Sequence, residues 1–204
     1  KPGDPMNSVL HQKIVGNTSF GDRMPQGGSA LAQADEEKIK NWIQNGAVKD
    51  WSGGSGGVVT TLAGSGSVGS ADGTGTAASF NGPIGVAVDG SGNVYVAGYQ
   101  NHRIRKITSA GVVTTLAGSG SVGSANGTGT AASFNEPIDV AVDGSGNVYV
   151  ADYGNHLIRK ITSAGVVTTL AGSGSVGSAN GTGTAASFNY PSGVAVDGSG
   201  NVYV

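Results

Sequence analysis

The sequence of 204 residues contains no cysteine, only three histidines and few charged residues, which make up 12% of the chain. A chain without cysteine cannot form disulfides, iron–sulfur clusters, thiolate zinc sites or the CxxCH attachment of a haem. Three histidines are too few for a lyase or hydrolase whose metal is held by several of them. We therefore predict no metal site, no catalytic residues and no enzymatic activity.

The charge of the chain is nearly balanced. Eleven Lys and Arg face thirteen Asp and Glu, giving a formal net charge of −2. The basic surface that nucleic-acid binding requires is therefore missing. No apolar run is long enough to predict a membrane-spanning helix. The opening Lys1-Pro2-Gly3 does not resemble a natural start, so we expect the chain to be part of a longer protein.

A long, nearly perfect repeat fills most of the chain. Residues 58–111 and 112–165 differ at only six of 54 positions, and a third copy runs from Val166 to Val204. A period of this length, in units too small to bury a core alone, is typical of repeat architectures. The 38 glycines, with many Ser and Thr, fit a turn-rich, secreted β-protein.

Each copy predicts four short strands, which in the first copy are residues 58–62, 83–88, 93–97 and 103–108. They are rich in β-branched residues and separated mostly by glycine-containing turns. Four antiparallel strands per unit, repeated around an axis, make a β-propeller. Phe80, Phe134 and Phe188 recur in phase just before a proline, and we expect each to pack between adjacent blades.

Two six-residue segments point to a family. Asn101-His-Arg-Ile-Arg-Lys106 and Asn155-His-Leu-Ile-Arg-Lys160 resemble the motif that names the NHL repeat, and the segments Val86–Asp89 and Gly92–Ala97 are also similar to that family. The resemblance covers residues 58–204 and implies a propeller, commonly of six blades. The chain supplies under three repeats. Its fold class is thus mainly β, a partial propeller of four-stranded antiparallel blades.

Residues 1–50 have a different composition and predict two helices. Asp4 can cap the first helix, which begins at Pro5, and the second spans about residues 33–45 and ends before Gly46. Residues 51–57 form a Gly/Ser-rich linker that separates this domain from the repeats.

The helical segment resembles the C-terminal half of a planctomycete-type cytochrome c domain. That resemblance implies that Met24, in Gly21-Asp22-Arg23-Met24-Pro25, is an axial ligand of haem iron. The CxxCH motif is absent, so we predict no cofactor within this chain, and a haem c in the intact protein is the alternative. An ordinary core methionine is the other interpretation of Met24.

Two motifs in each repeat suggest ligands but favour simpler interpretations. Gly64-x-Gly66-x-x-Gly69 matches a dinucleotide fingerprint, yet no apolar helix follows it, so we predict a loop that crosses between blades. Asp89-Gly-Ser-Gly-Asn93 alternates oxygen ligands as calcium sites do, but it lacks further carboxylates, so we predict a turn. His102 and His156 are expected to hydrogen-bond between strands.

The few differences between the copies are not scattered. They lie in or beside the loop before the 83–88 strand and the loop between the third and fourth strands, which share one edge of a four-stranded meander, and the turns at the opposite edge do not vary. Loops on a rigid scaffold often carry function, although drift tolerated by longer loops is the alternative. The differing positions are Asp72/Asn126/Asn180, Gly82/Glu136/Tyr190, Ile84/Ile138/Ser192, Gly85/Asp139/Gly193, Gly98/Asp152, Gln100/Gly154 and Arg103/Leu157.

These patterns predict an exported bacterial protein, extracellular or periplasmic, that acts as a non-catalytic scaffold or binding protein. The predicted partner is a protein or glycan on the variable edge, with further blades or other copies of the chain as partners in assembly. The alternative function is electron transfer by a haem domain fused to a propeller. The side chains predicted to contact the ligand are Glu136, Asp139, Asp152, Tyr190 and Arg103.

Overall fold

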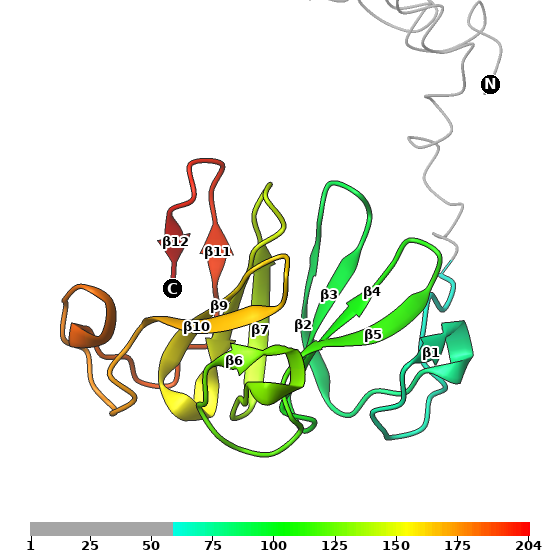
Figure 1. Cartoon of the computed structure of the whole chain (residues 1–204), viewed down its shortest axis with the longest axis horizontal. Coiled ribbons are helices and arrows are strands. Elements are labelled where there is room, and N and C mark those ends of the chain that lie inside the picture. Colours follow the sequence, from blue (N-terminus) through cyan, green and yellow to red (C-terminus); the bar gives the residue numbers. More distant parts are fainter. Residues whose placement is uncertain (1–58) are drawn as a thin grey trace, which may run out of the picture. The chain divides into compact units, whose positions relative to one another are not determined.

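The computed structural model describes residues 59–204 (Figure 1). The predicted helices of residues 1–50 and the linker of residues 51–57 lie outside the described residues. Within residues 59–204 the regular structure consists of β-strands and four three-residue 3-10 helices. The fold of this part is therefore mainly β, as the sequence predicts.

Two five-stranded antiparallel sheets form the body of the described part. The first has the order β1-β5-β4-β3-β2 and the second the order β6-β10-β9-β8-β7. A third, two-stranded sheet pairs β11 with β12. The strands are β1 (Gly73–Thr74), β2 (Pro83–Val88), β3 (Val94–Gly98), β4 (Arg103–Ile107), β5 (Val112–Ala117), β6 (Gly127–Thr128), β7 (Pro137–Val142), β8 (Val148–Asp152), β9 (Leu157–Ile161), β10 (Val166–Ala171), β11 (Ala195–Val196) and β12 (Val202–Tyr203).

Short 3-10 helices interrupt the loops. Three of them occupy the same place in each copy, after the Gly-rich loop, and a fourth follows β8. They are η4 (Gly75–Ala77), η5 (Gly129–Ala131), η6 (Tyr153–Asn155) and η7 (Gly183–Ala185).

Each five-stranded sheet takes strands from two successive copies, which corrects the predicted boundary of the unit. Residues 112–117, which open the second copy, pair as β5 with β4 of the first copy, and β10 pairs in the same way with β9. In the first copy the described residues of the corresponding run, 59–62, form no strand. A strand needs a neighbouring strand for its backbone N–H and C=O groups, and within residues 59–204 no strand pairs with this run.

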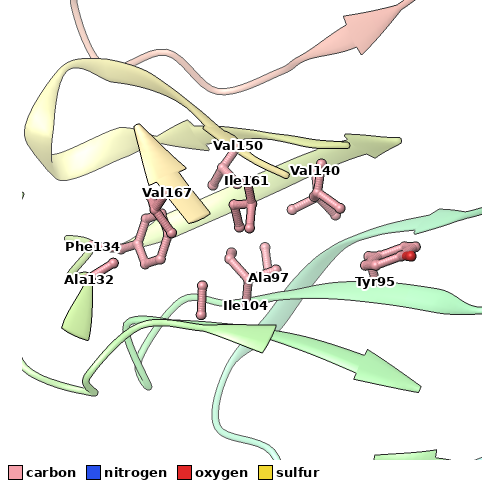
Figure 2. Close-up of a cluster of buried hydrophobic side chains, with 11 residues drawn as sticks. Tyr95, Ala97, Ile104, Ala132, Phe134, Val140, Val150, Ile161 and Val167 are labelled. Carbon is pink, nitrogen blue, oxygen red and sulfur yellow. The ribbon is translucent and has the colours of Figure 1, made fainter. Parts of the chain in front are cut away.

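The main core lies between the two five-stranded sheets. Tyr95, Ala97 and Ile104 of the first sheet face Val140 and Val150 of the second, and all five are buried (Figure 2). The contacting strands are β2 and β3 on one side and β7 on the other. The opposite face of the second sheet packs against the third, where Tyr149 and Ala151 contact Val194. Neighbouring sheets therefore stack face to face through strands of the same kind.

Phe134 lies between the sheets, as the repeat pattern predicts. Its side chain is fully buried, in one cluster with Ile104 and Ala117 of the first sheet and Val167 of the second. The loop before it, from Gly118 onward, carries the chain from the first sheet to the second. This loop runs on to η5, so the glycine motif at its start begins a crossing between sheets, as expected.

The turns at one edge of the sheets are identical in every copy and internally bonded. The carboxylate of Asp89 accepts the backbone N–H groups of Ser91 and Asn93 at 2.9 Å, the Asn93 amide at 2.8 Å and the Tyr95 hydroxyl at 3.0 Å. Asp143 and Asp197 make the same set of bonds. These donors use the acceptor capacity of the carboxylate, which confirms a turn in place of a calcium loop.

These turns predict a specific sensitivity to acid. The Asn93 side-chain bond, with the other donors, lowers the pKa of Asp89 from 3.8 to about 2. The same bonds lower the pKa of Asp197, and at Asp143 burial opposes them but the net shift is also downward. Because the folded pKa is the lower one, the stability that these bonds contribute is fully present above about pH 4 and is lost as the pH falls towards 2.

Urea unfolding of the full chain, followed by far-UV circular dichroism at pH 6, 4, 3 and 2, measures this loss. We expect the midpoint to fall steeply below pH 4. The control is the triple variant Asp89→Asn, Asp143→Asn, Asp197→Asn, which should be less stable at pH 6 but change less between pH 4 and 2. Parallel acid profiles for the two proteins would contradict the assignment.

Candidate functional site

One edge of the sheets collects most of the positions at which the copies differ. Pro83, at the start of β2, pairs with Gly98 at the end of β3, and the Tyr99 N–H donates to the Gly82 carbonyl at 3.0 Å. In the second copy the Gly154 N–H donates to the Asn135 carbonyl at 2.9 Å, so the same two loops are joined through neighbouring residues. We call this edge the variable rim and define it as residues 82, 98–103, 136, 152–157 and 190. The constant turns of residues 89–92 and 108–111 lie at the other end of the strands (Figure 1).

Two of the differences between copies, at positions 72/126 and 98/152, belong together. Each copy has a carboxylate at one of these positions, and it pairs with a buried arginine. Arg105 is fully buried, and its guanidinium lies 2.7 Å from the half-exposed carboxylate of Asp72. In the second copy Asn126 replaces Asp72, and the equivalent Arg159 lies 2.9 Å from Asp152 instead, with both side chains fully buried. The first copy has glycine, Gly98, in place of Asp152. The carboxylate has thus moved from the loop to the end of the strand.

Asp152, one of the predicted ligand contacts, is fully buried and bonded to groups of the fold. Its carboxylate also accepts the Asn135 N–H and the Asn155 side-chain amide, both at 2.8 Å. The guanidinium that it faces donates to the carbonyls of Ser133 and Ala125, each at 3.1 Å. With no exposed surface and every bond directed inward, Asp152 has nothing left to offer a ligand.

Asp139 fills a space between copies that glycine leaves open. A Cβ added to Gly85 would lie 2.6 Å from the Asp139 Cα, so the first copy needs glycine where the second has aspartate. One carboxylate oxygen of Asp139 accepts the Val194 N–H of the third copy at 2.9 Å. The side chain is half-buried. Asp139 therefore contacts both neighbouring copies, through Gly85 of the first and Val194 of the third. Only part of its surface stays exposed for a ligand.

Arg103 is held by the crossing loop. Its guanidinium donates to the Ser119 carbonyl at 3.1 Å and lies against Gly120. Leu157, the equivalent residue of the second copy, is buried. The position therefore serves packing in both copies, although Arg103 itself keeps part of its surface exposed.

Glu136 and Tyr190, the other two predicted contacts, belong to one row of side chains on the variable rim. The Tyr153 and Tyr190 rings lie 4.8 Å apart between centroids, tilted by 38°. Burial raises the pKa of Tyr99, and the negative charge of the Glu136 carboxylate raises it further. The charge of Tyr153 also raises the pKa of Tyr99. We call Tyr99, Glu136, Tyr153 and Tyr190 the rim row.

The backbone of the rim row is held by histidines of the preceding copy. The Glu136 N–H donates to His102 Nδ1 and the Tyr190 N–H to His156 Nδ1, each at 3.1 Å. The His156 ring also meets the edge of Tyr190, with centroids 4.4 Å apart and planes at 73°. The sequence predicted that these histidines hydrogen-bond between strands, and the structure shows that they bridge successive copies.

The position occupied by Glu136 and Tyr190 is strained for any residue other than glycine. Its φ is 58° at Gly82, 53° at Glu136 and 51° at Tyr190. A left-handed conformation costs a residue with a side chain roughly 1 kcal/mol. Since glycine serves the first copy, the fold itself does not require a side chain at this point.

Comparing the copies missed half of the rim row. Tyr99 and Tyr153 are identical in the first two copies, so a search for differences cannot detect them. The signal available was an aromatic residue directly after the variable position 98/152, in a turn where no core packing was predicted.

Met24, the predicted haem ligand, lies outside the described residues, and covalent haem c attachment would need cysteines that this sequence does not contain. Within residues 59–204, no three His, Asp or Glu side chains are grouped closely enough to hold a metal ion.

Comparison with known families agrees with this geometry. A family model described as NHL repeat matches residues 80–107 and 134–161. These two segments are similar to NHL repeats. The matches run from Phe80 to the end of β4 and from Phe134 to the end of β9, so they cover β2–β4 and β7–β9.

Two curated relatives and one solved structure share the repeats. The chain is 36% identical over 91 residues to Protein SUPPRESSOR OF QUENCHING 1, chloroplastic, of Arabidopsis thaliana, a match covering 44% of this chain and 9% of that protein. It is 36% identical over 121 residues to NHL repeat-containing protein 2 of Bos taurus, covering 57% and 16%. A crystal structure of a structural genomics protein of unknown function from Bacteroides thetaiotaomicron is 30% identical, with a TM-score of 0.51 over 54% of this chain and 29% of that one. These matches support the NHL propeller segment and a β-propeller-like fold, and the chain spans only a small part of each relative.

Proposed function

We propose that this protein is a non-catalytic scaffold of the extracellular or periplasmic space of a bacterium, and that its variable rim binds a protein or glycan. The carrying observation is that Glu136 and Tyr190 replace glycine at a strained position of the rim, where the Tyr190 ring packs against Tyr153. The 72/126 and 98/152 exchange is explained by charge balance, and drift does not readily explain a costly substitution. A binding function on the exposed loops of a rigid scaffold explains why a costly substitution is kept.

The other polar groups of the rim favour binding over catalysis because they are committed to the fold. Asp152 pairs with Arg159, and one oxygen of Asp139 accepts a backbone N–H. His102 and His156 use Nδ1 to accept backbone N–H groups. A general base needs a free acceptor within reach of the substrate, and the geometry leaves these groups little of that role.

Self-association or further blades form the second part of the proposal. Ile84, Val86 and Val88 on β2 are about 60% exposed, at 58%, 62% and 61%. Val140, the equivalent of Val86, is 3% exposed because the first sheet covers it. The open face of β2 therefore matches a face already paired within this chain, and another blade, from the same chain or a second copy, fits it.

Electron transfer stays the alternative function, and it rests on the resemblance around Met24 alone. A pyridine haemochrome spectrum of the intact protein tests it. A c-type haem signal would support electron transfer. No haem signal would contradict it.

The rim variant Glu136→Gly, Tyr190→Gly tests the binding proposal, because it restores the residue of the first copy at both positions and should not harm folding. The full chain is screened on an array of defined glycans and on a panel of purified extracellular matrix proteins. We expect at least one specific binder whose affinity falls about tenfold or more in the rim variant, as the loss of an anchor side chain would produce. Ser91→Ala, in a constant turn, is the matched control and should bind normally. Binding that is equal in the rim variant and the parent, or no binder on either panel, would overturn the proposal.

A further inference from the structure

We propose that the loop of residues 172–188 forms a pocket for the guanidinium group of an arginine that is carried on a peptide segment of a partner. This loop follows β10 and contains η7 (Figure 1). None of its residues belongs to the variable rim, so the inference is independent of the rim ligand. It follows from how the equivalent loops of the first two copies hold Arg105 and Arg159.

The loop of the second copy holds a guanidinium through four groups. Arg159 donates to the carbonyls of Ser133 and Ala125, each at 3.1 Å, and to the side-chain oxygen of Asn126 at 2.9 Å. The guanidinium carbon lies 5.3 Å from the centre of the Phe134 ring. The first copy holds its arginine with the equivalent carbonyls, side chain and ring. Binding of a guanidinium is therefore a property of this loop that the chain uses twice.

The loop of the third copy is built in the same way. Residues 172–188 are identical in sequence to residues 118–134. The Ser187 N–H donates to the Ala179 carbonyl at 3.0 Å, and the Ala179 N–H donates to the Ser187 hydroxyl at 2.9 Å, as their counterparts do in the second copy. The backbone that carries the acceptors is thus already ordered, so a ligand would lose little affinity in arranging it.

In the third copy these groups line a cavity. Its volume is about 510 Å³, and its lining includes Ala179, Asn180, Ser187 and Phe188. The arginines of residues 59–204 lie elsewhere, two of them in the loops of their own copies and Arg103 against the loop of the second copy. A guanidinium offers five N–H donors in a plane and a face that stacks on aromatic rings, whereas a lysine ammonium is a point charge. The pocket therefore suits arginine better than lysine.

A further contact specifies the segment that carries the arginine. Asn155, four residues before Arg159, donates its side-chain amide to the Gly123 carbonyl at 2.8 Å, and the first copy has the same bond. Gly177, the equivalent of Gly123, lines the cavity of the third copy. We therefore expect the ligand to have the pattern Asn-x-x-x-Arg, which meets the loop at two points.

The charge of the guanidinium narrows the choice further. In the second copy the loop has the neutral Asn126, and the carboxylate comes from Asp152, seven residues before the arginine. In the first copy Asp72 of the loop supplies the carboxylate itself. The third loop has Asn180, so it should prefer a segment that brings its own carboxylate at the same spacing, because an unpaired cation is costly to bury.

The test titrates the ¹⁵N-labelled full chain with an acetylated synthetic peptide of residues 152–160 and follows the amide NMR signals of residues 177–189. We expect saturable shifts centred on these signals. The same peptide with Arg159→Lys should bind about tenfold more weakly, and the peptide with Asp152→Gly about fivefold more weakly. The absence of saturable shifts, or equal binding of the arginine and lysine peptides, would overturn the proposal.

The variant Asn180→Asp tests the charge rule on the side of the pocket. It gives the third loop the residue of the first copy, so the peptide with Asp152→Gly should now bind more tightly than the unchanged peptide. Asn126→Asp is the matched control, because it makes the same substitution in an identical loop that Arg159 already fills, and it should bind both peptides as the parent does. Equal effects of the two variants would contradict the assignment of the pocket. Circular dichroism melting curves check that each variant is folded.

A dilution series of the chain without peptide identifies the source of the arginine. Shifts of the same signals that grow with chain concentration would support a second copy of this chain as the donor. Signals that do not change with concentration, together with peptide binding, would support another polypeptide that carries the pattern.

Discussion

Replacing Asp152 with alanine should lower the free energy of unfolding of the repeat domain by about 3–5 kcal/mol, the range seen when one member of a buried ion pair is removed. The guanidinium of Arg159 would stay fully buried and lose the carboxylate that now lies at 2.9 Å. The Asn135 N–H and the Asn155 amide would each lose an acceptor as well. Urea unfolding of the full chain, followed by far-UV circular dichroism, measures the change.

The first copy provides a matched control for this prediction. Asp72→Ala removes the carboxylate from the equivalent Arg105, but Asp72 is 52% exposed, so water can reach the space that it vacates. We expect a smaller cost of about 1–2 kcal/mol. In the Asp152→Ala background, Asn126→Asp should recover much of the loss, because it places a carboxylate where the first copy has one. Equal costs at Asp152 and Asp72, with no recovery by Asn126→Asp, would contradict the exchange.

Replacing Phe134 with alanine should cost about 3–5 kcal/mol, as large-to-small changes of buried phenylalanine do. Phe134 is fully buried and packs against side chains of two sheets, so the cavity would open at their interface. Neighbouring sheets are rigidly packed on both sides and cannot collapse fully into it. The same urea and circular dichroism measurement applies.

Phe80→Ala is the control for this interface. Phe80 has the same neighbours in sequence, and the guanidinium of Arg105 lies 5.3 Å from its ring, as that of Arg159 does from Phe134. The cation–π contribution therefore cancels in the comparison. Phe80 packs on one sheet only and is partly exposed, so we expect about 1–2 kcal/mol. A cost at Phe80 as large as that at Phe134 would show that packing between sheets is not the source.

The local features of the fold could be predicted from the sequence. β-branched runs and glycine turns act over a few residues, so the strands near residues 83–88 and 103–107 and the turn at Asp89 follow from composition alone. The boundary of the sheet could not be predicted, because β4 of one copy pairs with β5, which opens the next copy. A periodic sequence is equally consistent with any starting point within its period.

The candidate site was predictable only in part, for a related reason. Glu136 and Tyr190 differ between copies and so attract notice. The role of Asp152 depends on Arg159, seven residues away on the next strand, and on Asn126 in the preceding loop. The paired changes at 72/126 and 98/152 were visible in the sequence, but only the structure shows that both positions face the same guanidinium.

The closing of each sheet by a strand of the next copy has a consequence for how the chain reaches its native pairing. β5 and β10 have the same sequence, Val-Val-Thr-Thr-Leu-Ala, so side-chain chemistry does not determine which of them pairs with β4. The choice depends on distance along the chain, since β5 follows after the turn Thr108–Gly111 and β10 only one repeat later. By chain entropy the nearer strand is preferred by roughly 2 kcal/mol, a margin that a high concentration of nascent chains can erode. Exchange of identical strands between molecules is therefore the characteristic error that this architecture invites during synthesis, and dilution is its simplest remedy.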